Sequence, residues 1–317
     1  MIKIYGMIVG SLLFAVAAFG QQESQYTQFV YHKQGLNPGF AGSQDVASLT
    51  ALYRQQWMGL EGAPALQILS FNTPLMKNRV GFGVNITRNT LGIHERITGD
   101  FVYSYRIKME NGNLGLGVQA SIRNFSMDYS DDRLRATDGL SSDGSIPVGQ
   151  QNRVLPNFGS GLYFSNRKLY IGFSVPRLIR NNIDFNDLGG EASEEINHYY
   201  LMGGYLFHLS DLLSLQPQLL LKYAPDVPFD ADFNLSLSLA QRYTIGLGYR
   251  LGGPEDGFGE SLDFLVSALV AEDWVFGFSY DMSLGQLRDY NSGSIEALVQ
   301  YRLSKEDRSE IINPRFF

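Results

Sequence analysis

The sequence predicts an all-β protein, a transmembrane antiparallel up-and-down β-barrel of about fourteen strands with an N-terminal plug or rim segment. Three observations support this fold class. Apolar or aromatic residues alternate with Gly, Ser, Asn, Gln or Arg along most of the chain, and the connections between these segments alternate in length. The chain also contains 13% aromatic residues and 34 glycines, and barrels use aromatic residues at both membrane interfaces and glycine where wall or lumen is crowded.

The stretch 274–281 shows the alternation most clearly, because Trp274, Phe276, Phe278 and Tyr280 share one register. Successive side chains of a strand point to opposite faces, so such a segment has one apolar face and one polar face. The same pattern predicts strands at residues 45–57, 65–72, 79–87, 97–108, 113–125, 155–164, 168–175, 197–207, 213–223, 232–239, 243–251, 261–270, 274–282 and 294–303. Most of them reach the roughly 9 to 11 residues that a tilted strand needs to cross a bilayer.

The connections between the predicted strands are a second, independent signal. Outer-membrane barrels join strands by short periplasmic turns and long external loops. The even-numbered connections include short polar turns near residues 110–112, 165–167, 240–242 and 271–273, whereas the odd-numbered ones include 126–154, 176–196, 252–260 and 283–293. This parity predicts a closed barrel with both chain ends in the periplasm, and a β-sandwich gives no reason for it.

Residues 1–20 are predicted to be a cleaved signal peptide, because one lysine precedes a short apolar run that ends on small residues. The alternative is an N-terminal membrane helix, but the run is shorter than the roughly 20 apolar residues that a span requires. The remaining regions are predicted to be an irregular N-terminal segment (21–44), the outer-membrane barrel (45–304) and a periplasmic C-terminal tail (305–317).

Composition excludes several functional classes. The chain has no cysteine, so disulfides, cysteine-ligated zinc and cysteine nucleophiles are ruled out. The net charge of −7 disfavours nucleic-acid binding and attachment to an anionic membrane surface. The four histidines lie far apart in the sequence and outside metal-ligand spacing, and no G-x-S-x-G motif occurs. We therefore expect no catalytic, cofactor-binding or metal-binding residues.

Two of the long connections are acidic. The connection 126–154 carries five aspartates, and 176–196 carries Asp184, Asp187, Glu191, Glu194 and Glu195. Clustered carboxylates suit hard cations or a basic partner, although the spacing matches no defined calcium loop. The alternative is an ordinary solvated surface, which is the commoner role of a charge run. Residues 176–182 are expected to form one short helical turn at the rim.

Four sequence blocks near the N-terminus occur in a fixed order. Residues 25–29 read Q-Y-x-x-F, 36–42 read L-N-P-x-x-A-G, 54–64 contain R-x-Q-W-x-G-L-x-G-A-P, and 79–92 read R-V-G-F-G-V-x-I-x-x-N-x-x-G. These blocks resemble the PorP/SprF family of type IX secretion system outer-membrane proteins of Bacteroidota. Gly39-Phe40 departs mildly from the Ala-Tyr that is more frequent in this family.

The resemblance implies a non-enzymatic barrel in the type IX secretion and gliding motility system. Such a barrel assists the export or surface anchoring of large adhesins with a type IX C-terminal sorting domain, and some members contact periplasmic components of the system. The implied partners are therefore outer-membrane lipid, an adhesin C-terminal domain and periplasmic type IX components, with no nucleic acid. The motif positions that carry over as partner-contacting or plug residues are Tyr26, Asn37, Pro38, Gly42, Trp57, Gly59 and Pro64.

Two other functions remain open at this stage. Inward-facing Arg106, Arg123, Lys222 and Arg250 would line an outer-membrane channel for small solutes, or they would pair with acidic residues across a filled interior. A soluble exported β-sandwich would instead need the outward aromatic residues buried in a core.

Overall fold

A computed structural model describes residues 23–131, 133–134, 149–183, 194–225, 227–252, 259–271 and 273–303. The predicted signal peptide (1–20) and C-terminal tail (305–317) lie outside the described residues. The strands are β1 (Ala47–Gln55), β2 (Ala65–Leu75), β3 (Val80–Leu91), β4 (His94–Met109), β5 (Gly112–Asp128), β6 (Gln150–Ser165), β7 (Leu169–Val175), β8 (Tyr199–Tyr205), β9 (Phe207–His208), β10 (Leu213–Tyr223), β11 (Asp230–Leu239), β12 (Tyr243–Leu251), β13 (Ser261–Val270), β14 (Trp274–Ser283) and β15 (Ser294–Leu303).

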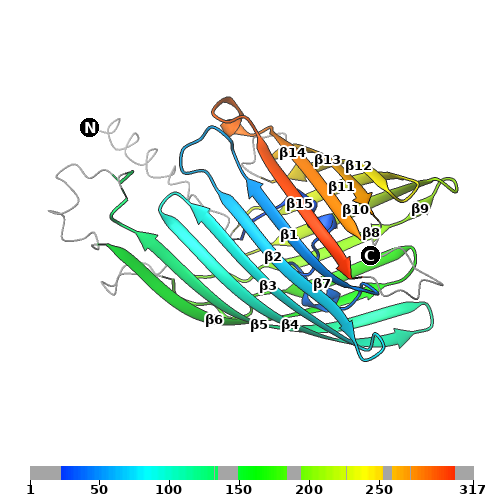
Figure 1. Cartoon of the computed structure of the whole chain (residues 1–317). Helices are drawn as coiled ribbons and strands as arrows, with labels where there is room; N and C mark the ends of the chain where they lie inside the picture. Colours follow the sequence, from blue (N-terminus) through cyan, green and yellow to red (C-terminus); the bar gives the residue numbers. More distant parts are fainter. Residues whose placement is uncertain are drawn as a thin grey trace, which may run out of the picture.

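These strands form one closed antiparallel sheet, seen from the side in Figure 1. Apart from β8 and β9, each strand pairs with its neighbours in sequence, and β1 pairs with β15 to close the wall. Both β8 and β9 pair with β10 and share one position in the wall, so the barrel has fourteen strand positions. The predicted barrel is confirmed.

The two faces of the wall have opposite character. In β5, the outward side chains of Val118 and Ile122 are exposed, while the inward side chains of Gln119, Ser121 and Arg123 are buried. The same apolar-out, polar-in alternation recurs from strand to strand. This arrangement inverts that of a water-soluble β-sandwich, because the apolar face has no protein partner and requires lipid.

The predicted strands are all present, with differences at their ends. β5 extends to Asp128 and β6 begins at Gln150, and these two residues pair, so the connection is 129–149 instead of 126–154. Beyond the apolar belt both strand faces are polar, so the alternation stops although the hydrogen-bond ladder continues. Residues 176–182 form no helical turn, contrary to expectation. Instead, Arg177 reaches Asp100 inside the barrel at 3.1 Å.

The ends of the barrel differ as the parity of the connections predicts. The turns 76–79, 110–111, 166–168, 209–212, 240–242 and 271–273 lie at one end, the short-turn end. The strand ends that flank the connections 56–64, 92–93, 129–149, 176–198, 224–229, 252–260 and 284–293 lie at the other, the long-loop end. The tight turn 92–93 is the exception to the length rule. Among the described residues, no helix has the length and apolar character of a membrane span.

Candidate functional site

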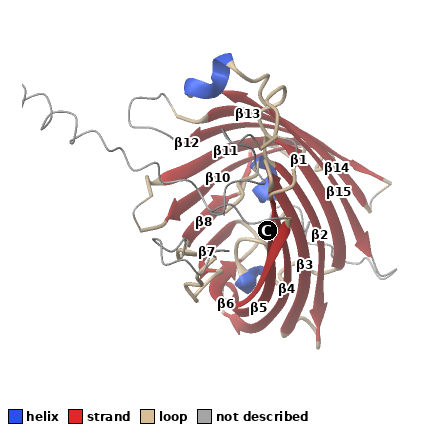
Figure 2. Cartoon of the chain, turned by 90° about the vertical axis from the view of Figure 1, so that its left-hand side faces the viewer, coloured by secondary structure: helices blue, strands red, loops and turns tan. Residues whose placement is uncertain are grey.

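Residues 23–46, which we term the lumen segment, occupy the inside of the barrel. They include two 3₁₀ turns, η2 (Thr27–Val30) and η3 (Pro38–Phe40). The turn η2 contacts β13, β14 and β15, whereas η3 contacts β4, β5, β6 and β7. The view along the barrel in Figure 2 shows both turns enclosed by the wall. The segment therefore bridges opposite sides of the barrel interior.

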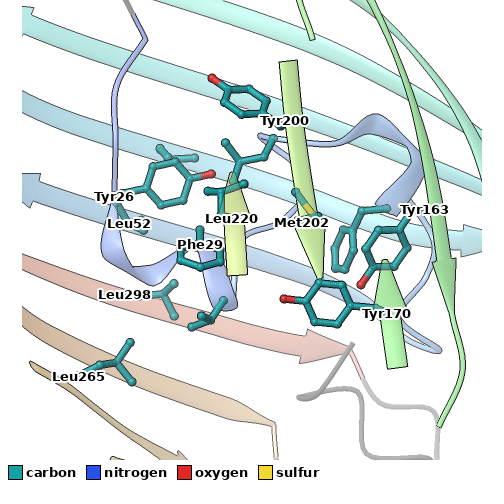
Figure 3. Packing of buried hydrophobic residues seen from close by; sticks show 14 of the residues in the cluster. Tyr26, Phe29, Leu52, Tyr163, Tyr170, Tyr200, Met202, Leu220, Leu265 and Leu298 are labelled. Atoms are coloured by element: carbon teal, nitrogen blue, oxygen red, sulfur yellow. The ribbon is translucent and has the colours of Figure 1, made fainter. Parts of the chain in front are cut away.

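An apolar cluster holds the middle of the lumen segment. Tyr26 and Phe29 are buried against inward-facing apolar residues of the wall (Figure 3). Leu36 and Phe40 belong to the same buried cluster. Phe40 packs edge-on against Tyr163 with ring centroids 5.3 Å apart. The wall contributes Leu52, Leu66, Ile68, Tyr163, Tyr170, Tyr200, Met202, Leu206, Leu220, Leu265 and Leu298. A water-filled lumen would not favour this many apolar side chains on its lining.

Inward-facing glycines of the wall fit the backbone of the lumen segment. A Cβ atom on Gly81 would lie 1.9 Å from the carbonyl oxygen of Ala41, and one on Gly117 would lie 2.2 Å from the backbone nitrogen of Gly39. Real Cβ atoms do not approach backbone this closely. The G-x-G pairs of β3 and β5 are thus close-packing positions, where glycine lets two backbones touch.

Polar contacts fix the start of the lumen segment to the wall. The backbone amides of Thr27 and Gln28 donate to the Glu296 carboxylate at 2.6 and 2.9 Å. The Thr27 hydroxyl donates to Asp281 at 2.9 Å. Arg54 pairs with both of these carboxylates, and its side chain is almost fully buried. The segment thus supplies backbone donors to Glu296 and a hydroxyl donor to Asp281, and Arg54 pairs with both carboxylates.

The four cationic residues predicted to face inward all have hydrogen-bond or ion-pair partners. Arg106 donates to the carbonyl oxygen of Gly42, and Arg123 pairs with Glu23 and Glu195. On the other side of the barrel, Lys222 lies 3.3 Å from Asp230, and Arg250 lies 2.5 Å from Asp232. Of the two alternatives that the sequence left open, the structure therefore favours cations that pair across a filled interior.

Four of the seven predicted site residues lie in the lumen segment. The Tyr26 hydroxyl donates to the carbonyl oxygen of His32 at 3.0 Å. Asn37 caps η3 by accepting from the Gly39 amide at 2.8 Å, and its Nδ2 donates to the carbonyl oxygen of Leu162 at 2.9 Å. Pro38, the first residue of η3, packs over Gly117.

The fourth of these residues, Gly42, has a φ of +70° that favours glycine. Its amide donates to Asn72 at 2.8 Å. A Cβ atom on Gly42 would lie 2.4 Å from the α-carbon of Gly81, so the two backbones are in close contact. All four predicted site residues in the lumen segment thus help to hold the segment in place.

The other three predicted site residues, Trp57, Gly59 and Pro64, lie outside the lumen in the β1–β2 hairpin. Trp57 and Gly59 have positive φ values of 48° and 91°, and the Pro64 carbonyl accepts from the Gln56 amide at 2.9 Å. The seven predicted site residues therefore do not form one site: four lie in the lumen segment and three in the β1–β2 hairpin.

The β1–β2 hairpin organises the long-loop end. The Met58 amide donates to the carbonyl of Gly293 at 2.8 Å, and the Gly92 amide donates to the carbonyl of Gly62 at 2.8 Å. Arg133 also donates to the Gly92 carbonyl, at 2.9 Å. We term the connected hairpin 56–64, turn 92–93 and connection 284–293 the long-loop rim. It joins connections that are distant in sequence into one surface.

A family model described as type IX secretion system membrane protein PorP/SprF matches residues 18–301 of this chain. The chain belongs to this family. The match covers the lumen segment, the rim hairpin and all of the described barrel except the last two residues of β15, so the resemblance seen in the sequence blocks is confirmed. The PorP/SprF protein is an outer-membrane β-barrel in the context of the type IX secretion system.

Solved structures of similar fold are distant from this PorP/SprF protein. Omp33 of Acinetobacter baumannii is 8% identical with a TM-score of 0.45, covering 81% of this chain and 97% of that chain. A FadL homologue of Pseudomonas aeruginosa is 13% identical with a TM-score of 0.44, covering 84% and 93%. The strand pairing itself shows the barrel. A comparison with curated proteins found no significant match.

The acidic connections of this PorP/SprF protein are only partly within the described residues, which exclude Asp132, Asp138, Asp143, Asp184, Asp187 and Glu191. Asp131 is half-buried, and hydrogen bonds from Arg133 lower its pKa to about 2. Glu195, predicted as part of an external acidic surface, is instead buried and pairs with Arg123 inside the barrel. Its acidic neighbours in the sequence indicated an external surface, and nothing in the local sequence indicated that its side chain points inward.

Sequence reasoning missed several residues that position the lumen segment. Glu23, Thr27 and Gln34 on the segment and Glu296 on β15 have buried polar contacts, and none was singled out from the sequence. A charged residue at an inward position of a strand was the available signal for Glu296. Among the described residues, no group of three or more His, Asp or Glu side chains could hold a metal ion.

Proposed function

We propose that this protein is a non-enzymatic barrel that assists export or surface anchoring of large adhesins carrying a type IX C-terminal sorting domain, and that it contacts them through the long-loop end. The main support for this proposal is that the lumen segment occupies the lumen. The lumen segment packs on the glycines, the apolar cluster and the paired charges of the wall, so the inner surface is already used by the chain itself.

The long-loop rim supports the location of the contact. Loops on a rigid scaffold usually carry recognition, and here the motif hairpin connects the β3–β4 turn and the β14–β15 connection. Tyr290 in that connection is 72% exposed, and Leu60 of the hairpin is exposed as well. The rim therefore offers a structured surface with accessible aromatic and aliphatic side chains, which suits a protein partner.

Membership of the family also supports a periplasmic contact as the second candidate. A barrel of a secretion system has neighbours on both sides of the membrane, and the short-turn end faces the periplasm. Its exposed Met76 at the β2–β3 turn is a contact available to a periplasmic component. The two ends can be tested separately because their residues do not overlap.

The deciding experiment replaces residues 135–148 with a short Gly-Ser linker and measures capture of a tagged adhesin C-terminal domain by the purified barrel. This replacement leaves the pairing of Asp128 with Gln150 in place. We expect the variant to insert in outer membranes and to bind the domain at least tenfold more weakly. A control replaces residues 253–258 of another external connection. If both variants bind as the unmodified barrel does, the contact is in neither of these connections. Unchanged binding by a Leu60→Asp/Tyr290→Asp variant of the long-loop rim would then contradict a contact at this end.

A solute channel is the alternative function, and it makes a distinct prediction. Two recesses beside the lumen segment have cavity volumes of about 30 and 60 Å³, enough for a few waters, since one water requires about 10 to 15 Å³. Because the lumen segment occupies the space between these recesses and the wall, the unmodified barrel is expected to show little ion conductance in a planar bilayer. Steady, solute-selective conductance of the intact chain would favour the channel instead.

A further inference from the structure

The two ends of the lumen segment lie at opposite ends of the barrel. At its first described residue, Glu23 pairs with Arg123 at 2.7 Å and with Arg96 at 3.2 Å. Arg96 stands two residues after the start of β4, next to the 92–93 turn, and Arg123 stands in the half of β5 that leads to the connection 129–149. Glu23 therefore lies near the long-loop end.

A second contact places the start of the segment at the same end. The side-chain amide of Gln25 donates to Asp230 at 2.5 Å, and Asp230 is the first residue of β11, directly after the connection 224–229. Three strands that are distant in sequence, β4, β5 and β11, thus hold residues 23–25 close to the long-loop mouth.

The end of the lumen segment lies at the short-turn end. Gly42 packs on Gly81, which stands two residues after the turn 76–79, and its carbonyl accepts from Arg106 near the end of β4. Asp45 accepts a hydrogen bond from Asn78 within that same turn, at 3.4 Å. From there β1 begins at Ala47 and runs back toward the long loops.

From these placements we infer that the lumen segment threads the whole barrel, so that Glu23 lies at the long-loop mouth, on the outer side of the membrane. The first strand does begin at the periplasmic end, as the parity of the connections predicts. The residues before it do not stay there, because 24 residues of segment cross the lumen from 23 to 46. This inference departs from the expectation, drawn from the parity of the connections, that the N-terminal side stays in the periplasm, and the experiment below decides between the two.

A compact charge cluster fastens the segment where it leaves the lumen. Arg96, Arg123 and Arg177 face the carboxylates of Asp100 and Glu195, and Glu23 supplies the third negative charge. Without Glu23, this buried cluster would contain three cations and two anions, which is costly in a poorly hydrated site. We term the cluster the mouth clasp. It holds the start of the lumen segment at the long-loop mouth.

The complete absence of cysteine allows a clean accessibility test. Three single-cysteine variants, Gln22→Cys, Tyr290→Cys and Asn111→Cys, are treated on intact cells with a membrane-impermeant maleimide. Tyr290 lies in an external connection and Asn111 in a short turn, so they report the two sides of the membrane. We expect Gln22→Cys to react on intact cells to the same extent as Tyr290→Cys, and Asn111→Cys to react only after the outer membrane is permeabilised.

Two results would overturn the inference. In one, Gln22→Cys reacts only after permeabilisation, as Asn111→Cys does; in the other, it reacts only after denaturation. Heat-dependent migration on a gel shows whether each variant has folded. If Gln22→Cys does not fold, a short epitope inserted between residues 22 and 23 replaces it. Antibody binding to this epitope on intact cells supports the inference, and binding confined to permeabilised cells contradicts it.

Discussion

The backbone amide of Thr27 donates to the Glu296 carboxylate at 2.6 Å, which joins the lumen segment to the last strand of the barrel across 269 residues of sequence. The carboxylate also pairs with Arg54 on β1, the strand that closes the wall against β15. One buried acidic residue therefore links the closure of the barrel to the position of the segment inside it.

Arg54→Met should destabilise the barrel strongly. It removes the arginine that pairs with Asp281 and Glu296 and leaves two buried carboxylates close together, for which a loss of about 3 to 5 kcal/mol is typical. Urea unfolding in lipid vesicles measures the change. The matched control is Arg88→Met, whose pair with Glu95 is largely exposed, with an expected loss of about 1 kcal/mol or less. Equal effects would contradict the buried network.

Gly117→Ala should loosen the lumen segment, because the added methyl group would overlap the backbone of Pro38 and Gly39. Overpacking of this kind costs about 1 to 3 kcal/mol. Gly99→Ala is the control, since a Cβ atom there meets nothing within 4 Å. Thermal unfolding followed by gel migration compares the two. A loss in Gly99→Ala as large as that in Gly117→Ala would indicate a general effect of replacing strand glycines.

Glu23→Gln should weaken the mouth clasp and expose the start of the lumen segment. A charge-assisted hydrogen bond contributes about 1.5 to 3 kcal/mol, so the released form should become at least about tenfold more populated. Trypsin cleavage after Lys33, which is buried in the intact protein, reports this release. Glu61→Gln in the exposed hairpin is the control. No acceleration in Glu23→Gln would show that the apolar cluster alone retains the segment.

Leu247→Arg tests the lipid-facing surface. Leu247 lies in the middle of β12 and points outward with 55% of its surface exposed. An arginine at the bilayer midplane of a barrel costs about 2 to 4 kcal/mol, whereas the same change at Tyr290 in an external connection should cost close to nothing. Folding into vesicles measures both. If both variants fold equally well, the outward face of β12 is not in contact with lipid.

The wall of the barrel could be predicted from the sequence because its chemistry repeats. Each strand such as 243–251 carries its own alternation, so local reasoning was enough to find its limits. The loop parity came from the same local information. Strand ends such as Asp128 were missed, because beyond the membrane neither face needs to be apolar and the alternation disappears.

The interior could be predicted only in part, because it depends on residues that are distant in sequence. Asn37 and Gly42 were identified from a family resemblance, but their partners Leu162 and Asn72 had no local signal. Glu195 was assigned to an external acidic surface because its neighbours are acidic. Its inward position results from Arg123, which stands 72 residues earlier and requires a carboxylate nearby.

The fit between wall glycines and the lumen segment has a consequence for chimeric barrels. Gly81 and Gly117 leave room for Ala41 and Gly39, so the shape of the segment is specified a second time by residues of β3 and β5. An exchange of residues 23–46 between two family members should therefore succeed only when the facing wall positions are exchanged as well. For protein engineering, the segment and its facing wall positions are one inherited unit.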